Sequence, residues 1–196
     1  MPPDSGGRDA ILDTSAKLFS QHGYKEVSIR DIAQACGLTN AALYYHFKNK
    51  DDLLLAMLQR DHEKTLAALH AAAHGPGDLR EDLKQLVACY AAITCERRQS
   101  FQTLRRDLSN VEDARGHKLF AEMHSSYLRP LEERLAQAQA DGELRPGNVR
   151  FYARLLHGMI VALTFEGRPD KPRKASAQEV AAAVDVFLKG VVTKKS

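Results

Sequence analysis

Polar and aromatic side chains gather on the free face of one short predicted helix that ends at Phe47. Leu43 and Phe47 lie one turn apart, so we expect both to point inward. Asn40, Tyr44 and Tyr45 then fall on the solvent side, where two tyrosines together are unusual. A carboxamide donates and accepts hydrogen bonds, and it can pair with both edge groups of an adenine. This face therefore suits the reading of double-stranded DNA.

Residues that could support other chemistry are few. His62, His70 and His74 are spaced eight and four residues apart on one predicted helix, so a metal site is conceivable. That segment is rich in alanine, and we expect histidines of the surface or core edge instead. Cys36 is one of three cysteines, for which reduced, inert thiols are the expectation. Because nucleotide-binding glycine loops and His-Glu-x-x-His or Cys-x-x-Cys motifs are absent from the sequence, we expect no enzyme, metal or cofactor.

Start and stop signals place the helix with the polar face after another short helix. Ser28 and Asp31 have the spacing of a capping box, which begins the first helix. Gly37 can adopt the left-handed conformation that ends it, and Thr39 can cap the second helix. Two helices joined by a glycine turn are typical of a helix-turn-helix, whose second helix enters the DNA major groove. We place this motif at about residues 31–50.

The chain resembles the tetracycline-repressor (TetR) family of bacterial transcription regulators in two runs, AKLFSQHGYKEVSIRDIAQACG and LTNAALYYHFKNKDDLL. The resemblance covers about residues 8–55 and implies a DNA-binding domain there. Beyond residue 55 it is one of architecture only. The resemblance implies that Arg30, Asn40 and Ala41 face base edges. It also implies that five residues contact phosphates or brace that surface: Thr39, Tyr44, Tyr45, His46 and Lys50.

Charge and hydropathy restrict the class of protein. The net charge is +3 with a pI near 8.7, and residues 24–50 carry four cations against two anions, which leaves +2. That is little for a duplex binder, so we expect two such domains and uncharged phosphate contacts to act together. A mean hydropathy of −0.38 predicts a soluble globular protein. Apolar runs such as residues 158–165 are far shorter than the ~20 residues that cross a membrane, so we expect no membrane association and a cytoplasmic location.

Helical periodicity continues to the end of the chain and predicts an all-α fold of about nine helices without strands. A flexible tail is expected at residues 1–7, and Pro130 should kink a helix over 112–140. The helix over 49–74 starts beside the helix-turn-helix and contains the domain boundary, near residue 55. Residues 56–196 would form an effector-binding and dimerisation domain. The other helices are expected at 8–22, 78–95, 100–109, 149–165 and 176–192, with a charged loop at 167–174.

The last two predicted helices carry more apolar surface than a terminal hairpin needs, which predicts a homodimer. A partner would place a second reading helix about 34 Å away, or a multiple of that distance. Packing within the chain is the alternative. The apolar positions are Leu155, Leu156, Met159, Ile160, Leu163, Val180, Val184, Phe187, Leu188 and Val191.

An effector site is predicted between the helices of the larger domain. A buried tyrosine hydroxyl needs a partner, so several aromatic residues with a methionine suit a concave site for a largely apolar ligand. The family resemblance supports a site there, although ordinary core packing is the alternative for each residue. The predicted lining is Leu66, Tyr90, Phe101, Leu104, Met123, Tyr127 and Tyr152.

The sequence therefore predicts a DNA-binding transcriptional regulator, resembling ligand-responsive repressors that bind a palindromic operator as dimers. The alternative is a helical architectural DNA-binding or scaffold protein without a ligand. Sequence-selective binding would support the first interpretation, and indiscriminate duplex binding would support the second.

Overall fold

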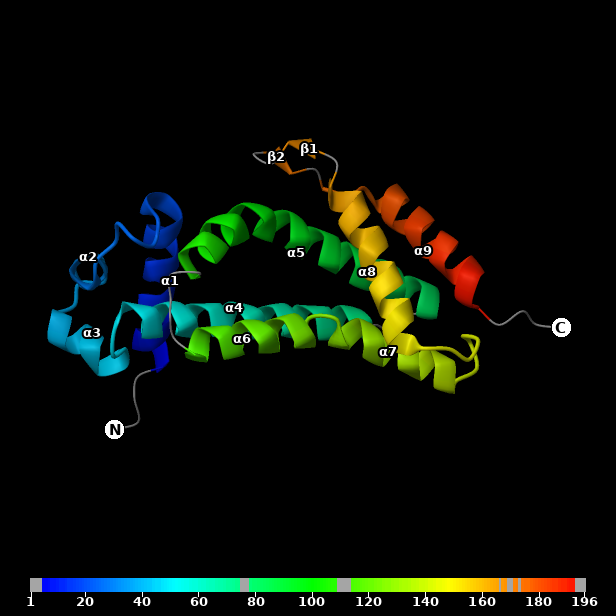
Figure 1. The fold of residues 1–196 in the computed structure, drawn as a ribbon, viewed down its shortest axis with the longest axis horizontal. Coiled ribbons are helices and arrows are strands. Elements are labelled where there is room, and N and C mark those ends of the chain that lie inside the picture. The colour runs from blue at the N-terminus through cyan, green and yellow to red at the C-terminus, as the bar shows by residue number, and fades with distance from the viewer. Residues whose placement is uncertain are drawn as a thin grey trace. The chain divides into compact units, whose positions relative to one another are not determined.

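Nine α-helices and one two-residue β-ladder form the regular structure of the described residues. The structure is a computed structural model, and it describes residues 5–74, 78–108, 114–165, 167–168, 171–172 and 174–192. The prediction of an all-α fold is confirmed. Figure 1 labels the helices α1 (Ser5–His22), α2 (Ile29–Ala35), α3 (Asn40–His46), α4 (Lys50–Ala73), α5 (Leu79–Leu108), α6 (Ala114–Ser126), α7 (Arg129–Ala140), α8 (Val149–Phe165) and α9 (Ala177–Val191).

The chain divides into two compact units. The N-terminal unit contains Met1–His62 and Ser100–Phe120, and the C-terminal unit contains Glu63–Gln99 and Ala121–Ser196. α4 begins in the first unit and ends in the second. The domain boundary predicted near residue 55 also falls within α4, and it stays a prediction. Within the described part of the chain, no helix has the length and apolar character that crossing a membrane requires.

Capping boxes begin α2 and α9, as the sequence predicts. The Ser28 hydroxyl accepts a hydrogen bond from the Asp31 N–H at 3.2 Å, and the Asp31 carboxylate accepts one from the Ser28 N–H at 2.8 Å. Ser176 and Glu179 make the same pair of contacts at the start of α9. Because each box satisfies backbone N–H groups that have no helical partner, these residues fix where the two helices begin.

α5 is one helix of 30 residues, whereas the sequence analysis predicted two, at 78–95 and 100–109. The residues between those ranges are Glu96, Arg97, Arg98 and Gln99. All four have high helix propensity, and no glycine or proline interrupts them. The predicted break was wrong because polarity alone does not end a helix.

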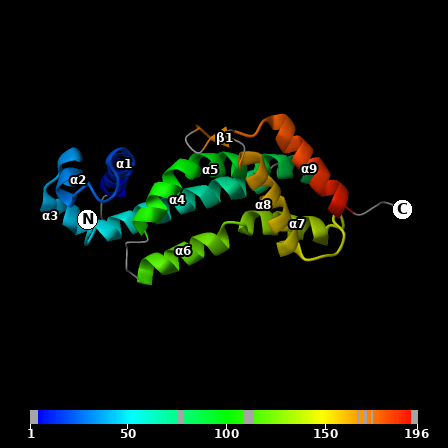
Figure 2. The same cartoon turned by 45° about the horizontal axis from the view of Figure 1, so that its top comes forward.

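The single helix predicted over 112–140 is two helices, α6 and α7, with a break at Tyr127 and Leu128 (Figure 2). Pro130 lies in the first turn of α7, a position where its missing N–H costs nothing. In a continuous helix that N–H would bond to the carbonyl of Ser126. Pro130 therefore ends one helix and starts the next, where the prediction had only a kink.

Two further differences concern short segments. α1 begins at Ser5, inside the tail predicted at residues 1–7. Within the loop predicted at 167–174, β1 (Gly167–Arg168) pairs antiparallel with β2 (Lys171–Pro172). Antiparallel strands need only a short connection, so a charged segment of this length can form a small ladder.

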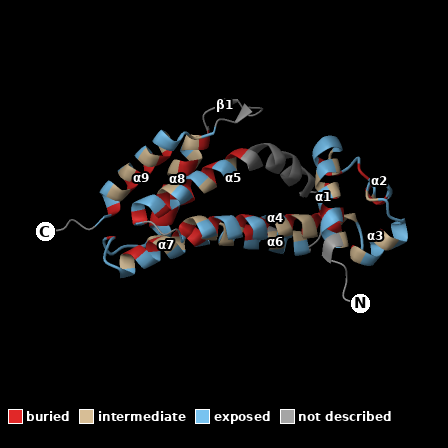
Figure 3. Ribbon diagram, turned by 180° about the vertical axis from the view of Figure 1, so that it is seen from behind, coloured by how far each residue is buried: buried red, intermediate tan, exposed pale blue. Residues whose placement is uncertain are grey.

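Each unit has its own apolar core, visible as the buried faces in Figure 3. α1 to α4 supply the core of the N-terminal unit: Ile11, Leu12, Phe19, Val27, Ile32, Leu43, Phe47, Leu53, Leu54 and Leu58. The other core includes Leu69 of α4, and most of its large residues come from α5 and α7 to α9: Leu83, Leu86, Tyr90, Leu131, Leu135, Leu156, Ile160, Val184 and Phe187.

α8 and α9 pack side by side in the C-terminal unit (Figures 1 and 2). Most apolar residues assigned above to a subunit interface are instead buried in their own chain: Leu156, Ile160, Val180, Val184, Phe187 and Val191. The 3-4 spacing marks a buried stripe but does not say which surface buries it. A second set of apolar side chains is exposed on these helices, with Phe151 54%, Leu155 47% and Val186 63% exposed.

Candidate nucleic-acid interface

The turn between α2 and α3 has the geometry of a Schellman motif. Gly37 has a φ of +67°, its N–H donates to the Gln34 carbonyl at 3.1 Å, and the Leu38 N–H donates to the Ala33 carbonyl at 2.8 Å. Any residue with a side chain would be strained at this positive φ. The turn thus ends α2 and leads directly into the cap of α3.

α3 has one buried face and one exposed face. Leu43 and Phe47 are almost fully buried in the N-terminal core. On the other side Tyr44 is 53% exposed and Tyr45 77%, and Asn40 is exposed in the first turn. The exposure predicted for these three residues is confirmed. A helix anchored in this way holds its outer side chains at fixed positions for contact with a partner.

The outer face offers several kinds of hydrogen-bonding group. The Thr39 hydroxyl accepts from a backbone N–H of α3 at 3.2 Å, which leaves its own O–H available to donate to a phosphate. Asn40 presents a carboxamide, whereas Ala41 presents a methyl group. The rings of Tyr45 and His46 meet edge to face with centroids 5.3 Å apart. The roles of these residues toward DNA stay predictions.

Arg30 lies exposed near the start of α2, beside the capping box. Hydrogen bonds from the side chain and backbone of Ser28 hold the pKa of Asp31 below its usual value, and Arg30 lowers it further. Asp31 is therefore ionised at neutral pH and fully engaged in the cap. The guanidinium of Arg30 remains on the surface, where its predicted contact with base edges is sterically possible.

Lys50 makes a bracing arrangement within the N-terminal unit. Its ammonium group donates to the carbonyls of Tyr24 at 2.7 Å and Val27 at 3.0 Å, and lies 4.2 Å from the centroid of the Tyr24 ring. The Tyr24 hydroxyl in turn donates to Asp51. The start of α4 is thereby attached to the turn between α1 and α2. Of the two roles predicted for Lys50, this geometry supports bracing.

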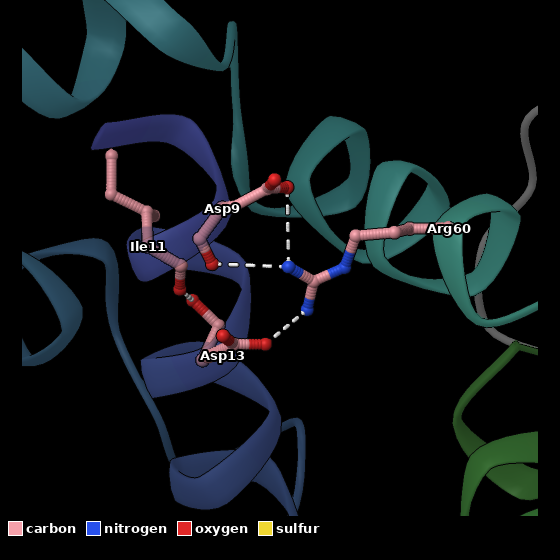
Figure 4. A network of polar contacts seen from close by, with 5 residues as sticks. Asp9, Ile11, Asp13 and Arg60 are labelled. Carbon is pink, nitrogen blue, oxygen red and sulfur yellow. Dashed lines mark hydrogen bonds and ion pairs between the residues drawn. The ribbon is translucent and has the colours of Figure 1, made fainter. Parts of the chain in front are cut away.

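Arg60 attaches a second point of α4 to α1 (Figure 4). Its guanidinium donates to the Asp9 carbonyl at 3.1 Å, to the Asp9 carboxylate at 3.2 Å and to the Asp13 carboxylate at 2.5 Å. The Arg60 side chain is 17% exposed, whereas both aspartates are mostly exposed. We refer to this arrangement as the Arg60 clamp. With Lys50, it joins α1 and the first part of α4 into one support for α2 and α3.

Arg8 is a candidate DNA contact that the sequence analysis did not include. Its guanidinium carbon lies 5.0 Å from the centroid of the Phe47 ring, immediately after α3, and the residue is exposed. Residues 8 and 47 are far apart in the sequence, so spacing could not reveal this contact. Arg8 adds a cation at the edge of the reading helix.

Family models match both units. One described as "Bacterial regulatory proteins, tetR family" matches residues 11–57, and one described as "Tetracyclin repressor-like, C-terminal domain" matches residues 76–165. This chain is a TetR-family transcriptional regulator. The resemblance inferred from the two runs around the helix-turn-helix is confirmed.

Known proteins similar to this TetR-family regulator cover nearly its whole length. The transcriptional repressor ComR of Escherichia coli K12 is 29% identical over 172 residues, which are 82% of this chain and 79% of ComR. The TetR-family regulator PfmR of Thermus thermophilus superimposes with a TM-score of 0.64 and 28% identity, over 91% of this chain and 97% of PfmR. A regulator from Saccharomonospora viridis, solved in complex with choline, superimposes with a TM-score of 0.71 and 23% identity, over 97% of this chain and 100% of that protein. At this identity the likeness shows the fold alone.

The residues predicted to line an effector site are only partly brought together. Tyr90 and Tyr152 are buried in the core of the C-terminal unit, and the half-buried Tyr127 packs against it. Met123 is buried on α6, and Leu66 is half-buried on α4. Phe101 and Leu104 lie outside the residues whose side chains are described. The effector site of this TetR-family regulator stays a prediction.

His157, on α8, joins Tyr90 and Tyr127 in an aromatic cluster that the sequence analysis missed. The ring centroids are 5.0 Å apart for the two tyrosines, 6.1 Å for Tyr90 and His157, and 5.7 Å for Tyr127 and His157. All three contacts are edge to face, the favourable geometry for aromatic pairs. Burial raises the pKa of the Tyr90 hydroxyl, and the neighbouring Tyr127 raises it further, so Tyr90 is a neutral donor at physiological pH.

The histidines considered for metal binding have other contacts. The Nδ1 of His70 lies 3.5 Å from the Glu133 carboxylate, and the Nδ1 of His74 lies 2.9 Å from the His70 carbonyl. Among the described residues no group of three or more His, Cys, Asp or Glu side chains is arranged to hold a metal ion. Cys36 is half-buried at the C-cap of α2.

Proposed function

We propose that this regulator binds a palindromic operator as a cytoplasmic homodimer and represses transcription until a small molecule binds the C-terminal unit. The observation that carries the proposal is the outer face of α3, where Asn40, Tyr44 and Tyr45 are exposed beside a completed turn. Large amphipathic side chains on that side of an anchored helix are open to solvent and to a partner. A major groove admits such a helix and offers hydrogen-bonding edges to it.

Selection from a random duplex library tests the operator. The wild-type protein should enrich an inverted repeat whose half-sites are one helical turn, about 10 base pairs, or a multiple of it apart. The Asn40→Ala variant should enrich the same repeat with relaxed preference at one symmetry-related position. Recovery of unrelated duplexes with no shared sequence would support architectural binding and contradict the proposal.

A dimer is needed because one α3 can read only a half-site, and the patch around it has a net charge of only +2. The exposed apolar residues Phe151, Leu155 and Val186 support an interface on α8 and α9. Positions 151, 155, 158 and 162 follow the 4-3-4 spacing of a helical seam, and all four are exposed. The small residues Gly158 and Ala162 would permit close approach of a second copy.

Light scattering tests this interface with two matched variants. Leu155→Glu places a charge in the exposed seam, so it should give a monomer at micromolar concentration. Ala136→Glu places the same charge on an exposed site of α7 and should remain a dimer. A monomeric wild type, or a dimeric Leu155→Glu, would contradict this assignment.

The repressor role and the effector are supported by similar proteins. ComR is named a transcriptional repressor, and the Saccharomonospora viridis regulator was solved with choline. In this chain we place a largely apolar effector in the C-terminal unit, against the half-buried Tyr127 and among Leu66, Tyr90, Met123 and Tyr152. A thermal-shift screen of a metabolite library should find a stabilising compound, since ligand binding raises apparent stability by mass action. Its shift should shrink in Tyr127→Ala, and an unchanged shift would exclude this location.

A further inference from the structure

The break between α6 and α7 contains a hydrogen bond from outside both helices. In an unbroken helix the Tyr127 carbonyl would accept from the N–H of Leu131. Here the Tyr90 hydroxyl, on α5, donates to the Tyr127 carbonyl at 2.6 Å. A side-chain hydroxyl from another helix thus bonds to the carbonyl that a continuous helix would pair with Leu131.

Packing fixes that hydroxyl in place. Tyr90 is fully buried, and its ring meets the rings of Tyr127 and His157 edge to face. α5, α8 and the break between α6 and α7 therefore meet at one aromatic cluster. A regular helix through this point would leave the Ser126 carbonyl without a helical partner, because Pro130 has no N–H. The Tyr90 hydroxyl is thus a fixed group from α5 that holds the Tyr127 carbonyl at the break between α6 and α7.

We propose that the break between α6 and α7 is a hinge, that the Tyr90 hydroxyl fixes its angle, and that operator affinity depends on this hydrogen bond. The inference rests on the proposed function, because it concerns how the same regulator is switched. A ligand that displaces the Tyr90 ring, or that offers a better acceptor to its O–H, would release the hinge. Tyr90 would then position α6 in addition to lining the proposed effector site.

The other end of α6 makes a contact that such a change would affect. Within the N-terminal unit, Arg115 in the first turn of α6 donates to one Asp52 oxygen at 3.2 Å. The second Asp52 oxygen accepts from the backbone N–H of Lys48 at 3.1 Å, directly after α3. A shift of α6 along or about its axis would therefore alter a contact at the exit of the reading helix.

Tyr90→Phe tests the hinge in the full-length protein, because it removes the hydroxyl and keeps the ring. Hydrogen exchange of the backbone amides at 127–132 should become about tenfold faster, the scale of one lost hydrogen bond. Binding to a duplex selected by the wild type should weaken by about fivefold or more, because a looser hinge spends less time at the angle that fits DNA. Thr164→Val removes a buried hydroxyl that donates to the Val161 carbonyl within α8 at 2.9 Å, and it should change neither measurement.

Pro130→Ala is a second, independent variant. It supplies the missing N–H, so α6 and α7 can approach one continuous helix, and binding to the same duplex should again weaken by about fivefold or more. Unchanged exchange at 127–132 in Tyr90→Phe would exclude the hydrogen bond. Faster exchange with unchanged duplex affinity in both variants would make the contact structural only and overturn the inference. If the wild type selects no duplex, the proposed function fails instead, while the exchange result still reports on the hinge.

Discussion

Tyrosines on α3 and tyrosines in the C-terminal unit occupy opposite environments. Tyr44 and Tyr45 are exposed on a helix whose other face is fully buried, and no core requires them. Tyr90 is fully buried, and its hydroxyl is satisfied by the Tyr127 carbonyl. An amphipathic side chain without a structural reason indicates a partner outside the chain. A buried one whose polar atom is satisfied is explained by the fold, and it identifies a ligand site only with further evidence.

The largest expected effect concerns charge inside the C-terminal unit. Arg134 donates to Asp82 at 2.8 Å, and the two side chains are 11% and 4% exposed. Arg134→Ala would leave a buried carboxylate without its cation and should lower the free energy of unfolding by about 3–5 kcal/mol. Chemical denaturation measures the loss. A double variant, Asp82→Leu with Arg134→Leu, should recover most of it because neither charge remains.

A more exposed ion pair, which also includes a residue of α5, provides the control. Arg80 contacts Asp185 at 2.6 Å, with side chains 53% and 35% exposed. Arg80→Ala should cost about 0–1 kcal/mol, because water screens this pair. Equal losses for Arg80→Ala and Arg134→Ala would show that burial does not separate the two.

In the N-terminal unit, Lys50 tests how much a partly buried charged group contributes to stability compared with an exposed one. Lys50→Ala would leave two carbonyls, of Tyr24 and Val27, without the ammonium donor and should lower the free energy of unfolding by about 1–3 kcal/mol. Lys48 is exposed, so Lys48→Ala should stay within about 0.5 kcal/mol of the wild type. A stable Lys50→Ala whose DNA binding has a flatter salt dependence would instead favour the phosphate contact.

The sequence could predict local features of the fold well. Ser28, Gly37, Thr39 and Ser176 determine helix ends through contacts within a few residues, and their spacing is visible in the sequence. Breaks decided by longer-range packing were less accessible. Pro130 signalled a disturbance, but the sequence does not show that the carbonyl at the break accepts from Tyr90, 40 positions before Pro130.

The DNA-binding face could be predicted from the sequence better than the effector site, again because local spacing is visible and long-range contacts are not. The outer face of α3 could be predicted because Leu43 and Phe47 lie one turn apart on the buried side, which leaves Tyr44 and Tyr45 on the other side. The contacts of Arg8 and Lys50 join residues far apart in the sequence, so no spacing revealed them. In the C-terminal unit, a core and a ligand site would be lined by the same types of residue. His157 meets Tyr90 and Tyr127 from another helix, so spacing did not reveal it.

Asn40 should affect sequence preference without affecting stability. Asn40→Ala removes an exposed carboxamide, so thermal unfolding should not change. Discrimination at one base pair of each half-site should fall by about 1–3 kcal/mol. Competition binding with single-base operator variants measures this loss. Preference unchanged at every position would remove Asn40 from the reading role.

The smallest expected effect is that of Arg8. If Arg8 contacts one phosphate, Arg8→Gln should reduce the slope of log affinity against log salt by about 0.9, with sequence preference retained. Lys17 lies nine residues further along α1, on the opposite side of that helix, and is also exposed. Lys17→Gln should leave the slope unchanged, and equal slopes for both variants would show that Arg8 is not a specific contact.

The Arg60 clamp determines where the N-terminal DNA-binding domain can be joined to another regulator in a chimera. A chimera joined at residue 55, the predicted domain boundary, would keep Asp9 and Asp13 but replace the arginine that holds them. The α1 helix would then lose both of its ion pairs with α4. A junction placed after His62, where the N-terminal unit leaves α4, would carry the clamp with the transplanted segment.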